Sequence, residues 1–392
     1  MRILVVDDDK DMRLLIRSTL TGMGYEVLLA SDGIEALSVL EREKIQLVIS
    51  DWLMPKMDGL ELCKRIRSSS FPGYVYVIIL TAKDSKGELT TAMEAGADDY
   101  IAKPFDKNEL GVRILAGERI LRLEMDLEDR NERLSKALSL LQKDLEAAAR
   151  IQKDLLPKAN INSCGFLFDW IFLPCSFVAG DTFNYMKVDN DHICFFLLDV
   201  SGHGVQAAML SFMLTKTLSS LILSGGFGAG LQSHLLSPVE TVLELNRRFQ
   251  ADDEIMQYFT MIYGVMNIRD GRISLVQAGQ PSPVYLRKGG EPVLIGSGGF
   301  PVGLNPNATF EELNLCLEPG ERIILYSDGI TDCTNQDGQA FSTERLVDLL
   351  QKGEGSSLRS LIERVEKNLR EWRGSDEWED DISLFAIERS IT

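Results

Sequence analysis

Short apolar runs alternate with amphipathic segments over the first third of the chain. The segments between the runs carry apolar residues at the spacing of a helix face. The runs are RILVVDD (2–8), EVLLAS (26–31), IQLVISD (45–51), YVYVIILTA (74–82) and DDYIA (98–102). Strands that alternate with helices indicate βαβ units and a parallel, doubly wound sheet. We therefore expect an α/β domain over residues 1–121.

The next segment has no proline, is highly charged and repeats apolar residues at helical spacing. We predict a coiled-coil linker and a homodimer over residues 122–157, because a polar Asn at an a position sets register in parallel dimers. A single amphipathic helix packed on a neighbouring domain is the alternative, since Gly117 and Glu124 interrupt the seam at its start. The heptad places Ile120, Leu127, Leu134, Leu141, Ala148 and Leu155 at d, and Asn131, Leu138, Leu145 and Gln152 at a.

After Pro157, a natural helix stop, the pattern changes to strands with many glycines. A few segments have apolar residues at helical spacing, and the two longest are 204–223 and 356–372. The clearest strand runs are CFFLLDV (194–200), YFTMIYGVMNI (258–268), ISLVQAG (273–279), ERIILYSDG (321–329) and DISLFAIE (381–388). Strands here mostly follow strands, so we expect an α+β domain over 158–392, a β-sandwich of antiparallel sheets flanked by helices.

Composition narrows the function classes. The 392 residues carry a net charge of −18, which argues against a nucleic-acid binder, because phosphate contacts need a basic surface. No basic amphipathic stretch favours a membrane, and no apolar run approaches the roughly 18 residues that span one. We expect a cytoplasmic protein. The six cysteines form no C-x-x-C pair and there are three histidines, so a disulfide framework or a zinc site is not expected.

Polar side chains end the strands of the first domain. Asp7 and Asp8 follow the first strand, Asp51 the third, Thr81 the fourth and Lys103 the fifth. The carboxyl ends of parallel strands converge on one crevice. Three carboxylates suit Mg²⁺, and a carboxylate held against Mg²⁺ and a lysine can accept a phosphoryl group. Each residue alone is as readily a turn or cap residue; the five together favour a phosphoryl site.

The motifs VVDDD, SDWLMPKMDG, LTA and AKPF carry a resemblance to the receiver domain of two-component response regulators. The resemblance implies Asp51 as the phospho-acceptor, with Asp7 and Asp8 beside it as Mg²⁺ ligands, and a sensor histidine kinase as partner. It further implies Thr81 and Lys103 as phosphate contacts and Tyr100 as the switching aromatic. Pro104, which follows Lys103, is a candidate cis proline.

Four stretches of the C-terminal domain place an aspartate beside a strand end. They are FVAGDTF with Asp181, LLDVSGHG with Asp199, ILYSDGI with Asp328, and EDDISLF with Asp380 and Asp381. An Asp-Gly pair is usually only a turn, yet isolated carboxylates after buried strands are costly unless a metal or partner compensates them. Acids without histidine or thiolate suit Mg²⁺ or Mn²⁺, and two such ions can activate a water for attack on a phosphate.

With the preceding ARIQKDLLP, these stretches resemble the bacterial PPM-type (PP2C-like) serine/threonine phosphatases of the SpoIIE and RsbU kind. The resemblance implies a binuclear site with Asp181, Asp199, Asp328 and Asp380 as catalytic metal ligands. It adds the Val200 carbonyl as a further ligand, and Asp381 is able to share or replace the role of Asp380. His203 is either a substrate contact, a general acid or a structural loop residue.

Two positions depart from the family pattern, which commonly has an aspartate at Asn184 and a histidine at Gln280. Because the four main acids remain, we expect an enzyme: a phosphatase controlled by phosphorylation of Asp51. The resemblance implies a phosphoserine or phosphothreonine protein as substrate, in relatives often an anti-sigma-factor antagonist of a partner-switching pathway. The alternative is a degenerate fold that acts as a phosphorylation-controlled adaptor, for example for a sigma factor. A DNA-binding output is disfavoured by the charge.

Overall fold

The computed structural model consists of two compact units, Met1–Leu140 and Leu141–Thr392. The structure describes residues 1–391 except 70, 72, 83–85, 225–234 and 251–257, and it leaves the side chains of 86–89 undescribed. The pattern SKGELTTAMEAG (85–96) predicts a helix between the fourth and fifth strands, and its first residue, Ser85, lies outside the described part. The expected domain limits at 121/122 and 157/158 remain predictions, because both fall inside or next to one long helix.

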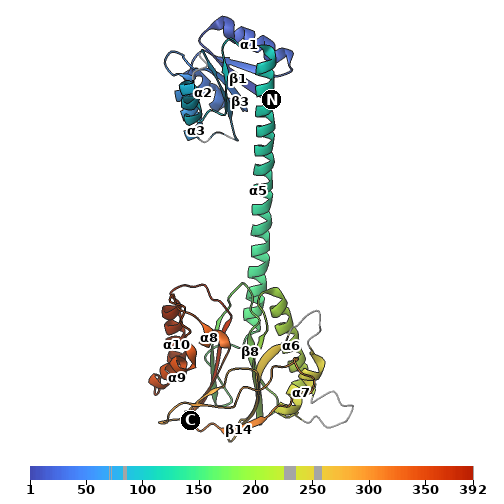
Figure 1. Ribbon diagram of the computed structural model, residues 1–392. Helices are drawn as coiled ribbons and strands as arrows, with labels where there is room; N and C mark the ends of the chain where they lie inside the picture. The colour runs from blue at the N-terminus through green and yellow to red at the C-terminus, as the bar shows by residue number, and fades with distance from the viewer. Residues whose placement is uncertain (70, 72, 83–85, 225–234, 251–257, 392) are drawn as a thin grey trace. The chain divides into compact units, whose positions relative to one another are not determined.

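The first unit is the expected α/β domain with a parallel sheet in the order β2-β1-β3-β4-β5. Apolar residues cover both faces of the sheet, because Leu4 and Val6 pack on one side and Ile3 and Val5 on the other. Its strands are β1 Arg2–Val6, β2 Glu26–Ala30, β3 Leu47–Asp51, β4 Tyr76–Thr81 and β5 Asp99–Ala102. Its helices are α1 Lys10–Gly22, α2 Gly33–Arg42, α3 Gly59–Ser68 and α4 Lys86–Glu94, followed by the start of α5 (Figure 1).

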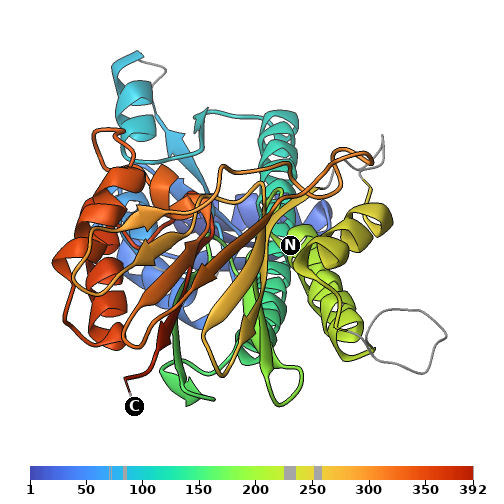
Figure 2. The ribbon, with the colours of Figure 1, turned by 90° about the horizontal axis from the view of Figure 1, so that it is seen from below.

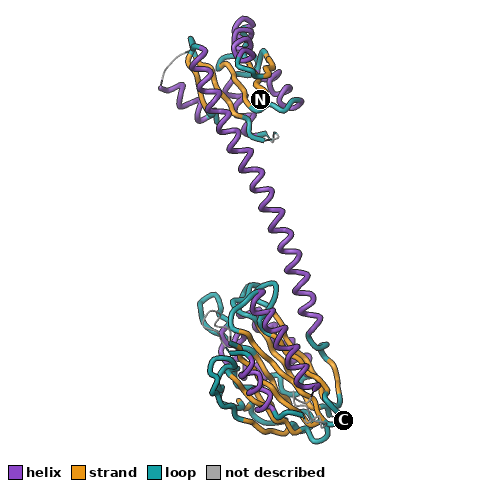
Figure 3. Tube along the Cα trace, turned by 90° about the vertical axis from the view of Figure 1, so that its right-hand side faces the viewer, coloured by secondary structure: helices purple, strands orange, loops and turns teal. Residues whose placement is uncertain are grey.

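Helix α5, Lys107–Leu155, is continuous over 49 residues and contains the expected helical linker (Figure 3). Its first turns pack on the receiver-like sheet through Leu110, Ile114 and Leu121. Further along, Leu127, Leu134 and Leu138 are exposed, as a coiled-coil seam without its partner would be. The linker and the last helix of the α/β unit are thus one element.

The second unit is the expected antiparallel sandwich. One sheet has the order β14-β11-β10-β9-β8 and the other β13-β12-β15-β16-β7-β6. The first sheet contains β8 Thr182–Lys187, β9 His192–Val200, β10 Phe259–Asn267, β11 Arg272–Ala278 and β14 Glu312–Cys316. The second contains β6 Ile161–Ser163, β7 Phe166–Leu173, β12 Val284–Leu286, β13 Val293–Leu294, β15 Arg322–Tyr326 and β16 Ile382–Arg389.

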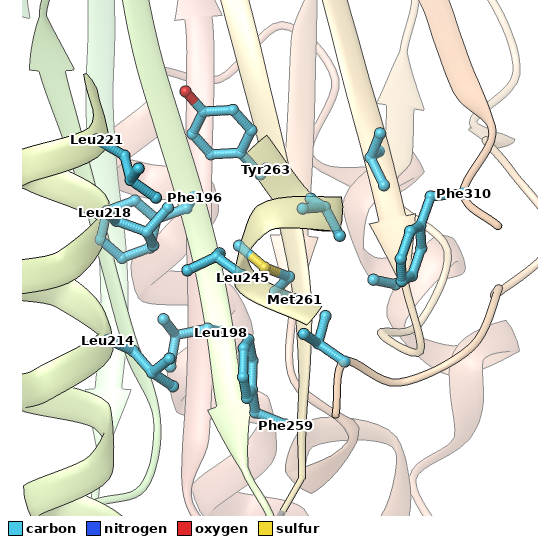
Figure 4. Packing of buried hydrophobic residues seen from close by; sticks show 14 of the residues in the cluster. Phe196, Leu198, Leu214, Leu218, Leu221, Leu245, Phe259, Met261, Tyr263 and Phe310 are labelled. Atoms are coloured by element: carbon cyan, nitrogen blue, oxygen red, sulfur yellow. The ribbon is translucent and has the colours of Figure 1, made fainter. Parts of the chain in front are cut away.

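Helices cover the two outer faces of this sandwich (Figure 2). Figure 4 shows Leu214, Leu218 and Leu221 of α6 directed toward Phe196 and Leu198 of β9. The helices are α6 Val205–Ser224 and α7 Pro238–Arg248 over one sheet, and α9 Ser342–Lys352 and α10 Leu358–Arg373 over the other, with the short α8 Asp328–Asp332 after β15. The inner layer between the sheets is apolar and rich in aromatic residues.

One helix differs from the expectation that no apolar run is long enough for a membrane. The stretch Val205–Leu223 of α6 meets that length and has a mean hydropathy of 1.3, with a third of it buried. A core helix of a soluble domain passes the same test, and the α6 leucines in Figure 4 serve such a core.

Candidate functional site

The sheet of the first unit brings the expected acidic residues together. One carboxylate oxygen each of Asp7, Asp8 and Asp51 lies within 4.8 Å of the others. The Lys103 ammonium lies 2.8 Å from Asp51 Oδ1 and 3.0 Å from Asp7 Oδ2. Burial raises the pKa of Asp51, and the Lys103 ammonium opposes that rise. Hard oxygen donors beside one fixed ammonium fit a cation and a phosphoryl group.

The backbone around this crevice is closely packed. A β-carbon on Gly59 would come within 2.2 Å of the Asp51 carbonyl oxygen, so only glycine lets α3 begin there. The Lys103–Pro104 bond is cis, as predicted. Thr81 is buried at the end of β4, and Tyr100 is half-buried with the Arg113 guanidinium 5.8 Å from its ring centre. The structure thus brings Asp7, Asp8, Asp51 and Lys103 together, and the roles of Thr81 and Tyr100 remain predictions.

In the second unit, four aspartates come from the rims of both sheets. Thr182 pairs with Leu198, so Asp181 and Asp199 are neighbours at one end of the β8–β9 pair. Asp328 begins α8 after β15, and Asp380 lies just before β16. A β-carbon on Gly329 would be 2.1 Å from the Asp381 carbonyl oxygen. Glycine at this position lets the two segments approach and places Asp328 beside Asp380.

Mutual charge and burial link these four carboxylates electrostatically. Burial, with the charges of Asp328 and Asp380, raises the pKa of Asp199 to about 7. Burial and the Asp199 charge raise the pKa of Asp181 well above its usual value. Burial and neighbouring acids also raise the pKa values of Asp328 and Asp380. Groups that perturb one another in this way lie near one another, and their common action as metal ligands remains a prediction.

The residues present fit hard divalent cations. Asp181 is completely buried, and neither of its carboxylate oxygens has a hydrogen-bond partner. Among the described residues, no lysine or arginine forms an ion pair with any of the four aspartates. Buried charge without a partner is strongly unfavourable. Oxygen donors without imidazole are the ligands that Mg²⁺ and Mn²⁺ prefer.

The two consecutive acids just before β16 have different surroundings. Asp381 is buried and accepts two backbone hydrogen bonds, from Cys175 N–H at 2.8 Å and from Gly180 N–H at 2.6 Å. Asp380 is exposed and carries its side chain among the other acids. Asp381 thus holds the loop that contains Asp181 in place, and Asp380 is the better ligand candidate. That assignment remains a prediction.

Two residues near the aspartates, Gln152 and Asp332, had no role at this site in the sequence analysis. Gln152 of α5 donates from Nε2 to the Ala179 carbonyl at 2.7 Å and accepts the Ala179 N–H on Oε1 at 2.9 Å. The heptad pattern had assigned Gln152 to a coiled-coil position, and this pairing corrects that assignment. Asp332, at the end of α8, raises the pKa values of Asp328 and Asp380 by its charge. The surrounding residues TDCTN (331–335) match no motif that would have marked Asp332 as a site residue.

The remaining candidates lie around the cluster. The Val200 carbonyl oxygen would be 2.9 Å from a β-carbon on Gly180, so it borders the segment that precedes Asp181. A charge on His203 lowers the pKa of Asp380, which places the imidazole near that carboxylate. Asn184 accepts the N–H of Tyr185 within β8. Gln280 is buried with both side-chain polar atoms unpartnered.

Comparisons with known proteins match both halves of the chain. The family model described as Stage II sporulation protein E (SpoIIE) matches residues 189–390, and the response regulator receiver domain model matches residues 3–115. The chain is 45% identical over 116 residues to the response regulator MprA of Mycobacterium leprae (strain TN), covering 30% of this chain and 50% of that protein. The chain spans about half the length of the curated relatives it matches.

A solved structure supports the fold of the second unit. The SiaA-PP2C domain of Pseudomonas aeruginosa superposes with a TM-score of 0.55 at 19% identity, covering 64% of this chain and 98% of that one. At that identity the likeness speaks for the fold alone. It confirms the expected α+β sandwich, while the roles of individual aspartates rest on their geometry.

Proposed function

We propose, because the chain belongs to the SpoIIE family and begins with a response regulator receiver domain, that it is a response regulator with a metal-dependent protein serine/threonine phosphatase as its output. The observation that carries the proposal is the cluster of four aspartates from two sheets, in which Asp181 is buried with both oxygens unpartnered. A purely structural role would leave this buried charge without compensation.

Bound divalent cations would supply Lewis-acid chemistry, bringing a water and a phosphate ester together and offsetting the charge on the transferred group. Asp181, Asp199, Asp328 and Asp380 would hold those cations, with the Val200 carbonyl as a further ligand. Asp199 lies near the other acids, and the charges of Asp328 and Asp380 add to burial in raising its pKa. We propose His203, whose charge lowers the pKa of Asp380, as a substrate contact or general acid.

Asp51 receives the phosphoryl group from a sensor histidine kinase, in a Mg²⁺ site formed with Asp7 and Asp8. Lys103, which pairs with Asp51 and Asp7, then binds the phosphate oxygens. Thr81 also contacts the phosphate, and Tyr100 is the aromatic residue that changes conformation. Such a charge change biases a conformational equilibrium. Helix α5, as a coiled coil in a homodimer, transmits the change to the second unit.

The route into the phosphatase site is short. Gln152 on α5 binds both backbone groups of Ala179, and Asp181 follows two residues later. Gly180 between them is fixed by Asp381. A rotation or shift of α5 therefore moves the segment that carries a proposed metal ligand, and this contact supports control of the site by the linker.

The substrate we propose is a phosphoserine or phosphothreonine protein, with an anti-sigma-factor antagonist of a partner-switching pathway as the first candidate. The protein acts in the cytoplasm as a homodimer. We propose a receiver domain over 1–121, a helical linker over 122–157 and a phosphatase domain over 158–392.

The test is hydrolysis of p-nitrophenyl phosphate with added Mn²⁺, by the intact protein and by Asp199→Asn. Each is assayed with and without beryllofluoride on Asp51 as a phosphoryl mimic. Metal-dependent turnover that Asp199→Asn abolishes supports the enzyme, and the effect of the mimic gives the sign of control. Absence of turnover in the folded protein would favour the adaptor, with Asn184 and Gln280 as the first residues to revert.

A further inference from the structure

A pocket lies at the ends of β15 and β16 that are remote from the aspartates. Arg322 at the start of β15 pairs with Glu388 near the end of β16, and both line this pocket. Asp328 follows the other end of β15 and Asp380 precedes β16, so the pocket shares no residue with the metal site proposed above. Its volume is about 660 Å³, within the roughly 300–1,000 Å³ of small-molecule sites. We propose that it binds a small organic phosphate, a phosphate group attached to an apolar ring.

Three cationic side chains line the pocket. Arg287 and Lys288 belong to the turn between β12 and β13, and Arg322 belongs to β15. The connection between α9 and α10 contributes Ser356 and Ser357 to the wall. The chain as a whole carries a net charge of −18, so three cations around one cavity depart from its average surface and favour an anion.

Arg322 keeps one donor group for a ligand. The residue is 9% exposed, and its Nε donates to Glu388 Oε2 at 2.5 Å while Nη2 donates to the Ser356 carbonyl. Among the described residues, Nη1 has no hydrogen-bond partner. A donor in so buried a side chain is unfavourable unless a ligand or water accepts from it. The planar guanidinium, held in place by two partners, matches the geometry of phosphate oxygens.

The turn between β12 and β13 adds positive charge that is not neutralised by an ion pair. In the described part of the chain, neither Arg287 nor Lys288 has a carboxylate within ion-pair distance. The Arg287 guanidinium lies 5.4 Å from the centre of the Tyr285 ring, a cation–π contact that leaves its charge available. Glu354, the second acid of the pocket, accepts the Gly289 N–H and so fixes this turn. Two cations of the turn therefore outweigh one carboxylate.

The start of helix α10 adds to this preference for an anion. Ser357 is the N-cap of this 16-residue helix and accepts the Ser360 N–H. The N-terminus of a helix carries a partial positive charge that favours phosphate groups. Because Ser357 also lines the pocket, that positive end borders the same cavity as the Arg322 guanidinium.

Apolar side chains of the cavity determine the rest of the ligand. They come from the β12–β13 hairpin, from α9 and from the last residues of the chain, and they are Leu286, Pro292, Leu350 and Ile391. Inorganic phosphate would leave these side chains in contact with water, whereas a ring attached to the phosphate covers them. The pocket therefore favours an organic phosphate over the free anion. Binding involves no covalent or redox step.

The experiment is isothermal titration of the full-length protein with adenosine monophosphate, adenosine and inorganic phosphate. A chelator is present throughout, so metal-bound phosphate at the aspartates makes no contribution. We expect the nucleotide to bind at least tenfold more tightly than either of its two parts. Lys288→Ala should weaken nucleotide binding by about tenfold, which corresponds to about 1.4 kcal/mol. Gln351→Glu, which adds a negative charge to the exposed wall of the pocket, should weaken it as well.

The control variant is Lys187→Ala, which removes an exposed lysine of the same unit outside the pocket and should bind the nucleotide as the wild type does. Circular dichroism checks the fold of each variant. An amine-reactive reagent, mapped by mass spectrometry, should label Lys288 more slowly when the nucleotide is present and Lys187 at an unchanged rate.

Two results would overturn the proposal. One is a nucleotide that binds no more tightly than inorganic phosphate or does not bind at all. The other is nucleotide binding that stays unchanged in both Lys288→Ala and Gln351→Glu. Because the titrations need neither metal nor turnover, they are independent of the proposed phosphatase activity, and failure of p-nitrophenyl phosphate hydrolysis would leave them unaffected.

Discussion

Gln152 holds Ala179 by both of its backbone groups, through hydrogen bonds of 2.7 and 2.9 Å. Ala179 is completely buried, so neither group has water as an alternative partner. Leaving a buried backbone group unpaired costs about 1–3 kcal/mol. The pairing makes the end of α5 part of the structure that positions Asp181, two residues beyond Ala179.

We therefore predict that Gln152→Ala loosens this segment and lowers the affinity of the second unit for Mn²⁺. The expected loss is about tenfold, since one such unpaired group is worth roughly 1.4 kcal/mol. Isothermal titration with Mn²⁺ measures the affinity, and thermal unfolding of the second unit measures its stability. A Mn²⁺ affinity equal to that of the wild type would show that the contact only anchors the helix.

The matched control for this variant is Gln142→Ala on the same helix. Gln142 is exposed, and among the described residues its side chain hydrogen-bonds to Glu146, one turn along. Such surface contacts contribute a few tenths of a kcal/mol. Both Mn²⁺ affinity and unfolding should stay at the wild-type values in this control.

The contrast between Gln152 and Asp51 shows what the sequence could predict. Asp51 directly follows an apolar strand, and a parallel sheet fixes where every strand ends, so its neighbours were predictable from pattern alone. Gln152 was assigned to a heptad position because the heptad pattern rests only on the spacing of apolar residues along the helix. That spacing contains no information on where the helix leaves solvent and meets the sandwich.

Asp380 and Asp381 illustrate a second limit. The sequence does not say which of the two adjacent acids faces the cluster. The structure distinguishes them through the Cys175 and Gly180 N–H groups, which come from a loop about 200 positions earlier in the chain. Cys175 itself lies on that loop, and its path depends on tertiary contacts rather than on local pattern.

Asp199 gives a prediction on pH and stability. Its pKa is about 7 in the folded, metal-free protein and about 3.9 in an unfolded chain. Between these values the folded state binds more protons, so this group lowers stability as pH rises from about 4 to about 7. Asp199→Asn removes that cost and should raise the free energy of unfolding at pH 8 by a few kcal/mol, at about 1.4 kcal/mol per pKa unit.

Urea unfolding of the second unit in a chelator, at pH 5 and at pH 8, measures this effect. The gain from Asp199→Asn should be smaller at pH 5, because the wild-type carboxyl is then largely protonated. Asp337→Asn, in an exposed turn, is the control and should be neutral at both values. A variant less stable than the wild type at pH 8 would contradict the raised pKa. Added Mn²⁺ should stabilise the wild type and have much less effect on Asp199→Asn.

The pairing of Asp51 with Lys103 leads to a prediction on phosphorylation of the receiver domain. Asp51→Asn should abolish labelling by a small phosphoryl donor, because an amide is not a nucleophile for this transfer. Lys103→Ala should leave Asp51 beside Asp7 without the shared ammonium, which favours Mg²⁺ binding but removes the phosphate contact. Phosphate-affinity electrophoresis follows the labelling. Asp11→Asn, on the surface of α1, is the control and should be labelled normally.

Gly329 gives the sharpest geometric prediction. A β-carbon at this position would be 2.1 Å from the Asp381 carbonyl oxygen, a distance that no pair of such atoms tolerates. Gly329→Ala must therefore push α8 away from β16 and separate Asp328 from Asp380. Overpacking of this kind costs typically about 1–3 kcal/mol. We expect lower stability of the second unit together with a loss of Mn²⁺ affinity of at least tenfold, by about 1.4 kcal/mol.

The control is Gly22→Ala near the end of α1, where nothing lies within 4 Å of the added carbon. That change should leave Mn²⁺ affinity unchanged. Metal binding and urea unfolding are measured on the same samples, so a loss of affinity is separated from a loss of fold. If Gly329→Ala is destabilised but binds Mn²⁺ as the wild type does, then Asp328 and Asp380 do not act on the same cations, and the four-aspartate site is wrong.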